Sequence, residues 1–209
     1  MKLAVVGKQF LQDVVLTRSF LWRLPAGRES ALTFDDGPHP LHTPALLELL
    51  QRHGIHANFF LIGERAAAHP GLVRDIAAAG HGIGSHTQTH RELPSLDAGQ
   101  LRWELQAARD AIREAAGIDT RLMRPPRGRI DAKSLLRVHR CGYKMVHWSR
   151  TYSDYLQDGV EPLVGRIRRS PLRDRDIALF HDTNAITILA LQRAIPEWLD
   201  AGRRFTVLA

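Results

Sequence analysis

Cysteine and long apolar runs are scarce in this sequence. Cys141 is the only cysteine among 209 residues, so no intrachain disulfide can form and nothing indicates an oxidising compartment. No stretch approaches the ~18–20 apolar residues of a membrane span. Only five uncharged residues separate Lys2 from Lys8, fewer than the ~7–15 apolar residues at the centre of a signal peptide. We therefore expect a cytoplasmic protein, with the inner membrane surface as an alternative site.

Low-complexity linkers and abrupt shifts in composition are also missing, which favours one main domain. A hydrophobic content of 44% with 24% charged residues is ordinary for a globular chain of this length. Residues 1–28 mix apolar side chains with Lys8 and Arg18. We expect this segment to pack on a domain formed by residues 29–209, and an amphipathic segment lying on a membrane is the alternative.

The net charge of +7 comes from 29 basic and 22 acidic residues. A surplus of this size is weak evidence for nucleic-acid binding, so we expect no nucleic-acid partner. An anionic glycan or a membrane surface remains compatible with it. Nothing in the composition favours one oligomeric state over another.

From Ser30 onward, short apolar runs alternate with amphipathic stretches, which predicts βα units around a mainly parallel sheet. Strands are expected over residues 30–35, 57–62, 81–86, 120–124, 143–149, 176–181 and 204–208. Helices are expected after Thr43-Pro44, around Leu72 up to Gly80, from Leu101 to Gly117, and over residues 131–140, 160–169 and 185–201. The predicted fold is an α/β protein, a distorted (β/α) barrel of about seven strands, and an open doubly wound sheet is the alternative.

Two adjacent acids, Asp35 and Asp36, follow an apolar run that Gly37 and Pro38 bring to a stop. The acids should therefore lie at the carboxyl end of a strand, where barrels place their active sites. Adjacent residues of a strand point to opposite faces unless the backbone bends. We expect such a bend at Gly37-Pro38.

The histidines of Ser85-His86-Thr87-Gln88-Thr89-His90 provide a second polar group after another strand. We expect His86 and His90, four residues apart, to lie on one side of a helical turn and to hold one ion. Two imidazoles with one carboxylate leave positions open for water and substrate. Each motif alone is more often a solvated turn or a helix face, and it is their joint occurrence that indicates a site.

Together, Thr33-Phe34-Asp35-Asp36-Gly37-Pro38 and the histidine motif resemble the first two motifs of the NodB-homology polysaccharide deacetylases, carbohydrate esterase family four. The resemblance extends from about Ala31 to the C-terminus, and it implies the same distorted barrel. It also implies that Asp36, His86 and His90 hold one divalent metal ion. Zinc is the expected ion, and Co²⁺, Ni²⁺ and Mn²⁺ are alternatives. Asp35 would then be the general base.

The third family motif is similar to Arg124-Pro125-Pro126-Arg127-Gly128. The resemblance implies that Arg124 tethers the catalytic Asp35 and that the backbone N–H of Arg127 forms part of an oxyanion hole. An aromatic residue is usual at the position of Arg127. Because the backbone carries the proposed role, we expect the arginine to alter substrate binding rather than to abolish activity.

The fourth and fifth motifs resemble Asp154-Tyr155 and Leu179-Phe180-His181. The resemblance implies that His181, paired with Asp154, protonates the leaving group and that Leu179 contacts the acetyl methyl group. Tyr155 stands where tryptophan is usual, so we expect a roomier or more polar substrate pocket. Taken alone, a histidine such as His181 is more often a hydrogen-bonded core residue.

These motifs predict a metal-dependent hydrolase that removes an N-acetyl group from a carbohydrate, releasing acetate and a free amine. The alternatives are an O-deacetylase of an acetylated glycan and a low-activity protein that binds metal and glycan. Candidate substrates are a chito-oligosaccharide and a lipid-linked glycan precursor, the latter with peripheral membrane contact. The extra cation at Arg127 favours an anionic substrate.

Overall fold

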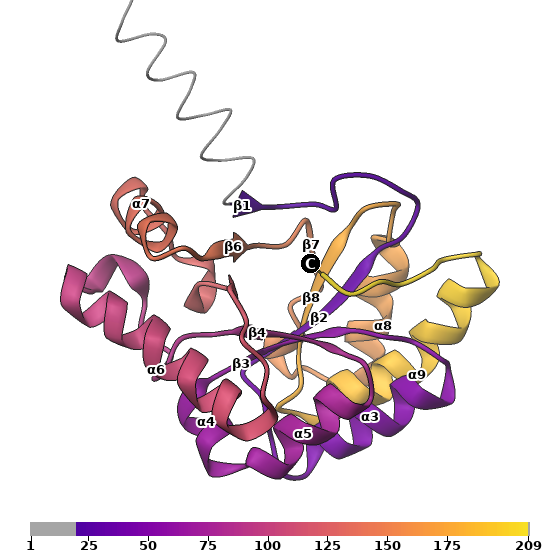
Figure 1. Cartoon of the computed structure of the whole chain (residues 1–209). Coiled ribbons are helices and arrows are strands. Elements are labelled where there is room, and N and C mark those ends of the chain that lie inside the picture. Colours follow the sequence, from indigo (N-terminus) through magenta and orange to yellow (C-terminus); the bar gives the residue numbers. More distant parts are fainter. Residues whose placement is uncertain (1–19, 209) are drawn as a thin grey trace, which may run out of the picture.

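A curled sheet of parallel strands forms the centre of the computed structural model, which describes residues 20–208 (Figure 1). The order of its eight strands is β1-β6-β5-β4-β3-β2-β8-β7, so β1 and β7 are the two edges of the described sheet. The strands are β1 Phe20–Leu21, β2 Ala31–Asp35, β3 Asn58–Leu61, β4 Gly82–Ser85, β5 Leu122–Met123, β6 Lys144–Val146, β7 Arg150–Thr151 and β8 Ile177–His181. The predicted α/β fold with a distorted barrel is confirmed.

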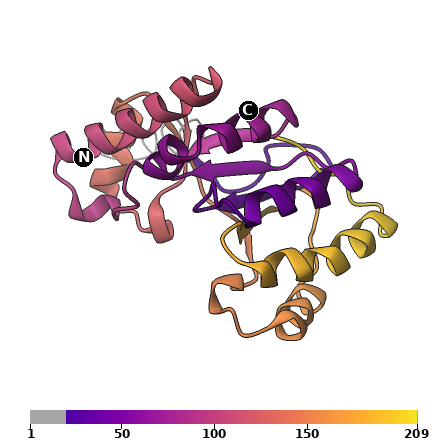
Figure 2. The same ribbon diagram turned by 90° about the horizontal axis from the view of Figure 1, so that it is seen from below.

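Helices cover the outer face of this sheet (Figure 2). They are α3 His42–Arg52, α4 Gly63–Ala68, α5 Pro70–Ala78, α6 Ala98–Ala116, α7 Ala132–Arg140, α8 Val160–Arg169 and α9 Ala185–Asp200. Local sequence fixes several of their ends. Asp97 and Gln100 form a reciprocal capping box at the start of α6, and Gly117 ends that helix in a left-handed conformation with φ 72°.

The sequence prediction was wrong at three strands. Residues 204–208 form only an isolated bridge from Phe205 to Ser30. Ser30 donates to Arg204 O and accepts from the Thr206 N–H across this bridge. The Asn58 side chain holds the rest of the segment, because it donates to Thr206 O and accepts from the Leu208 N–H. The two edge strands β1 and β7 were not predicted, since each is two residues long and carries no apolar alternation.

Part of the N-terminal segment can be located, because β1 pairs with β6 through Phe20 and Met145. Residues 1–19 lie outside the described part of the chain, so the expectation that residues 1–28 pack on the domain stays a prediction there. No helix between residues 20 and 208 is both long and apolar enough to cross a membrane.

Strand β2 separates the core from the polar interior of the curled sheet. Its residues Leu32 and Phe34 belong to the main apolar core between sheet and helices. Phe34 lies 5.3 Å from the Phe59 ring of β3, measured between ring centroids. The alternate residues Thr33 and Asp35 both accept hydrogen bonds from the buried Arg124. Because every strand is parallel, the carboxyl ends gather at one edge, and the candidate site lies there.

Candidate active site

The backbone turns sharply between the two acids that end β2. Asp36 has a left-handed conformation with φ 73°, which is costly for a residue other than glycine. Arg65 donates a 2.7 Å hydrogen bond to the Asp36 carbonyl oxygen and so holds the turn. A Cβ atom on Gly37 would lie 2.3 Å from the Asp182 carboxylate, so only glycine fits there. As a result both Asp35 and Asp36 line one pocket.

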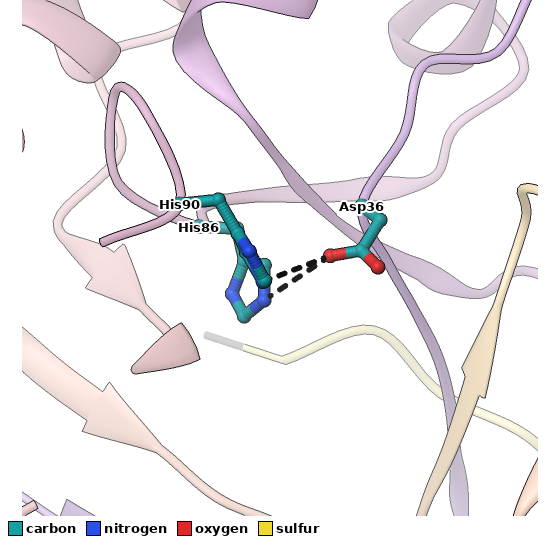
Figure 3. Close-up of side chains that lie close together, drawn as sticks. All are labelled: Asp36, His86 and His90. Carbon is teal, nitrogen blue, oxygen red and sulfur yellow. Dashed lines mark ion pairs between the residues drawn. The ribbon is translucent and has the colours of Figure 1, made fainter. Parts of the chain in front are cut away.

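The two histidines lie on an irregular loop, and the expectation of a helical turn was wrong. Residues 86–90 contain no helix, and Thr87 and His90 have φ values of 67° and 59°. This loop nevertheless directs both rings at one oxygen of Asp36 (Figure 3). The Nε2 atoms of His90 and His86 lie 3.3 and 3.5 Å from Asp36 Oδ1.

These three groups fit a divalent metal ion. Nδ1 of His86 lies 2.9 Å from the Arg124 carbonyl oxygen, which can only accept, so Nδ1 carries the proton and Nε2 presents a lone pair. Burial lowers the pKa of His86 to about 3, and the ring is therefore neutral. Asp36 Oδ1 is buried and has no hydrogen-bond donor among residues 20–208. Ligands at the ~2.1 Å bond lengths of tetrahedral zinc lie roughly 3.4 Å apart, close to the distances found here.

Asp35 forms a buried ion pair with Arg124. The guanidinium Nη1 lies 2.7 Å from Asp35 Oδ1, and neither side chain is appreciably exposed. Burial raises the pKa of Asp35, and the charge of Arg124 opposes that rise. Arg124 also donates to the carbonyl oxygens of Val146 and His147, so its orientation is fixed from two directions.

His181, at the end of β8, is held by Asp154. The His181 Nδ1 atom lies 2.9 Å from Asp154 Oδ1, and the buried carboxylate also accepts from the His181 N–H and the Thr187 hydroxyl. Burial lowers the pKa of His181. This effect is outweighed by the hydrogen bond and charge of Asp154 and by the charges of Asp35 and Asp36, which together raise the pKa to about 9. The imidazole is therefore protonated at neutral pH.

These groups surround one pocket of about 530 Å³. Eight of the residues that line it were singled out from the sequence: Asp35, Asp36, His86, His90, Arg127, Tyr155, Leu179 and His181. Arg124 and Asp154 stand behind the wall and hold Asp35 and His181. The structure thus brings every candidate residue together around a single site.

Comparison with known proteins decides the family. Residues 23–146, more than half of the chain, match the family model of the polysaccharide deacetylases. The chain belongs to the polysaccharide deacetylase family. It is 31% identical over 194 residues to a peptidoglycan-N-acetylglucosamine deacetylase of Bacillus cereus, with 90% of each chain covered. It is 35% identical over 185 residues to a chitooligosaccharide deacetylase of Sinorhizobium fredii, covering 82% of this chain and 86% of the relative.

A solved structure of the same family has the same fold. The family 4 carbohydrate esterase from Streptomyces lividans, in complex with acetate, superposes with a TM-score of 0.81 at 30% identity. The match covers 88% of this chain and 94% of that one.

The third motif of this deacetylase-family chain forms a tight turn. Arg127 has a φ of 55°, and its backbone N–H has no hydrogen-bond partner within the described residues. Gly128 allows the turn to pack on Trp148, since a Cβ atom there would lie 2.5 Å from the indole ring. The Arg127 side chain points to the pocket rim, where its Nη1 lies 3.1 Å from Glu92 Oε1.

Four lining residues escaped prediction: Glu92, Arg129, Trp148 and Thr151. Trp148 follows β6, and its position at the carboxyl end of a strand could have identified it as a pocket residue. Glu92 and Arg129 lie in loops, where no periodicity indicates which way a side chain points. Tyr155 is exposed at the rim, and its ring lies edge-on to His181 with centroids 6.3 Å apart.

Proposed function

We propose that this family member hydrolyses the N-acetyl group of an amino sugar within a glycan, producing acetate and a free amine. The observation that carries the proposal is the cluster of Asp36, His86 and His90, with a buried carboxylate and a protonated imidazole beside it. The deacetylase relatives and the acetate complex of the Streptomyces enzyme support this reaction.

The metal centre would be formed by Asp36, His86 and His90. Nitrogen and oxygen ligands in this combination suit Zn²⁺, and Co²⁺, Ni²⁺ and Mn²⁺ are accepted by similar sets. When bound, a divalent ion supplies Lewis acidity, which lowers the pKa of a water molecule and polarises a carbonyl oxygen.

Asp35 is the proposed general base. The Asp35 carboxylate lines the pocket. Arg124 donates a hydrogen bond to its Oδ1 atom and so fixes the orientation of the carboxylate. The carboxylate accepts a proton from the attacking water, and the water oxygen forms a bond to the acetyl carbon. The free N–H of Arg127 donates to the oxygen that becomes negatively charged, which lowers the barrier.

His181 is the proposed general acid. Asp154 holds Nδ1, which leaves Nε2 to donate a proton to the sugar nitrogen as the carbon–nitrogen bond breaks. The amine leaves neutral, and the acetyl group departs as acetate. Leu179, nearly buried in the pocket wall, offers the acetyl methyl group an apolar contact.

An anionic substrate is the finer part of the proposal. The sequence suggested Arg127 as the cation that binds it, but Arg127 is paired with Glu92, so the proposal rests on Arg129 instead. Asp36 faces the two imidazoles of the proposed metal site. The other charged lining residues have opposite partners: Asp35 with Arg124, His181 with Asp154, and Arg127 with Glu92. Arg129 also lines the pocket, but no acidic side chain within residues 20–208 pairs with it. A carboxylate or phosphate on the glycan would form an ion pair with the Arg129 guanidinium. A cytoplasmic location and a lipid-linked substrate remain predictions from the sequence.

The test is to incubate the purified protein with N-acetylglucosamine oligomers and to measure acetate and free amine together. N-deacetylation produces the two in equal amounts. Acetate without amine from an O-acetylated glycan would indicate an O-deacetylase instead. No acetate from either substrate would favour a protein that binds metal and glycan without turnover.

A further inference from the structure

We infer that Glu104, on α6, is a positioning residue that shapes the loop carrying His86 and His90 for metal binding. The inference rests on the proposed metal site. Glu104 is 1% exposed and lies on the face of α6 that buries Leu101, Leu105 and Ala108. A carboxylate on the apolar face of a helix is costly unless its oxygens are hydrogen-bonded.

Both carboxylate oxygens of Glu104 are used by the histidine loop. Oε2 accepts from the backbone N–H groups of Gln88 and Thr89, each at 2.8 Å, and Oε1 accepts from the Thr89 hydroxyl at 2.5 Å. Hydrogen bonds to an ionised acceptor are among the stronger ones in proteins. The residues that Glu104 holds are therefore those between the two metal-binding histidines.

The first turn of α4 also holds this loop. The N–H groups of Gly63 and Glu64 donate to the carbonyl oxygens of Thr87 and Gln88 at 2.9 and 3.1 Å. Gly63 permits close packing on both the loop and α6, since a Cβ atom there would lie 2.0 Å from Gln88 Oε1 and 2.6 Å from the Ala108 Cα of α6. The donors of the loop thus bond to α6 and its acceptors to α4.

This arrangement explains how an irregular loop can present two ligands without a helix of its own. Thr87 and His90 hold left-handed conformations, which surrounding contacts must stabilise. The hydrogen bonds to Glu104 and α4 are formed in the protein chain itself, so the two imidazoles face Asp36 before an ion arrives. Residues beyond the direct ligands typically change metal affinity by about 10–100-fold.

The test measures the zinc dissociation constant of the full chain by competition with a chromogenic chelator. We expect Glu104→Ala to weaken zinc binding about 10–100-fold. Glu104→Gln should restore most of the affinity, because the amide oxygen can accept from both N–H groups while the amide nitrogen donates to the Thr89 hydroxyl. At saturating zinc, kcat of the alanine variant should recover toward that of the wild type.

Arg109→Ala is the matched control. Arg109 is also buried on α6, but it pairs with Asp119, so the change weakens the helix without touching the histidine loop. Unchanged zinc affinity in Glu104→Ala, or an equal loss in Arg109→Ala, would overturn the inference.

If Glu104→Ala does not fold, Thr89→Val is the alternative variant. It removes one of the three hydrogen bonds to Glu104 and should weaken zinc binding by a smaller factor. Unchanged zinc affinity in Thr89→Val would count against the inference. A wild-type protein that binds no zinc would refute the metal site itself.

Discussion

Asp35 and His181 are direct partners in the register of β2 and β8, so the proposed base and acid end adjacent strands. This relationship couples their charges, because the Asp35 carboxylate is one of the groups that raise the pKa of His181. Each residue has its own partner behind the pocket wall, Arg124 for the base and Asp154 for the acid. Arg124 opposes the rise that burial causes in the pKa of Asp35, and Asp154 raises the pKa of His181 within the same pocket.

Loss of Arg124 should impair both stability and catalysis. Arg124→Met leaves the Asp35 carboxylate buried without a cation, and breaking a buried pair in this way costs about 3–5 kcal/mol. The pKa of Asp35, already raised by burial, should rise further, so the acidic limb of kcat/KM moves to higher pH. Chemical denaturation and a pH–rate profile measure the two effects.

Arg127→Met is the control for that prediction. Its ion pair with Glu92 lies at the surface, where such pairs contribute about 0–1 kcal/mol. Equal destabilisation by the two substitutions would show that the Arg124–Asp35 pair has no special role.

Substitution of the two adjacent acids should separate chemistry from metal binding. Asp35→Asn should retain the metal but lose activity, because an amide cannot take the proton. Asp36→Ala should lose both metal and activity, since it removes one of the ligands. Elemental analysis beside the acetate assay distinguishes the two. The reverse pattern would require the roles of Asp35 and Asp36 to be exchanged.

Activity should fall as pH rises through about 9, because the proposed donor is the protonated form of His181. Asp154→Asn removes the charge that supports the imidazolium, so the pKa of His181 should drop and the basic limb should move toward neutral pH. A pH–rate profile of kcat for both proteins checks this. A basic limb at the same pH in both would exclude His181, held by Asp154, as the acid.

The preference for an anionic substrate should depend on Arg129. Arg129→Gln should lower the ratio of kcat/KM for a carboxylated or phosphorylated amino sugar to that for neutral N-acetylglucosamine oligomers at least ~10-fold, the effect of losing ~1.4 kcal/mol of selective binding. Arg102→Gln is the control, because it removes an equal charge from the exposed face of α6. The same ratio in all three proteins would contradict a substrate role for Arg129.

Much of the site could be predicted because it follows strands with strong signals. The apolar run before Asp35 and the one before His181 end at the same edge of a parallel sheet, so their meeting required only the correct fold class. A bend was expected at Gly37-Pro38, but the strained backbone at Asp36 and in the histidine loop was not predicted. It depends on contacts from distant elements, of Arg65 with Asp36 and of Glu104 with Gln88.

Two other failures have different physical origins. The helix α4 was missed because it is only six residues long and ends next to the proline that begins α5. The segment 204–208 resembled a strand, yet its backbone pairs with Ser30 alone, and beyond that bridge the side chain of Asn58 bonds to Thr206 and Leu208. In the second case tertiary contacts, rather than local propensity, decided the structure.

The most direct test of the account is acetate release from N-acetylglucosamine oligomers by protein stripped of metal with a chelator and then titrated with zinc. The account predicts no acetate from the stripped protein and a return of activity that is complete at one zinc ion per chain. His90→Ala, which lacks one ligand, should require far more zinc. Undiminished acetate release by protein shown to be free of metal would contradict the account.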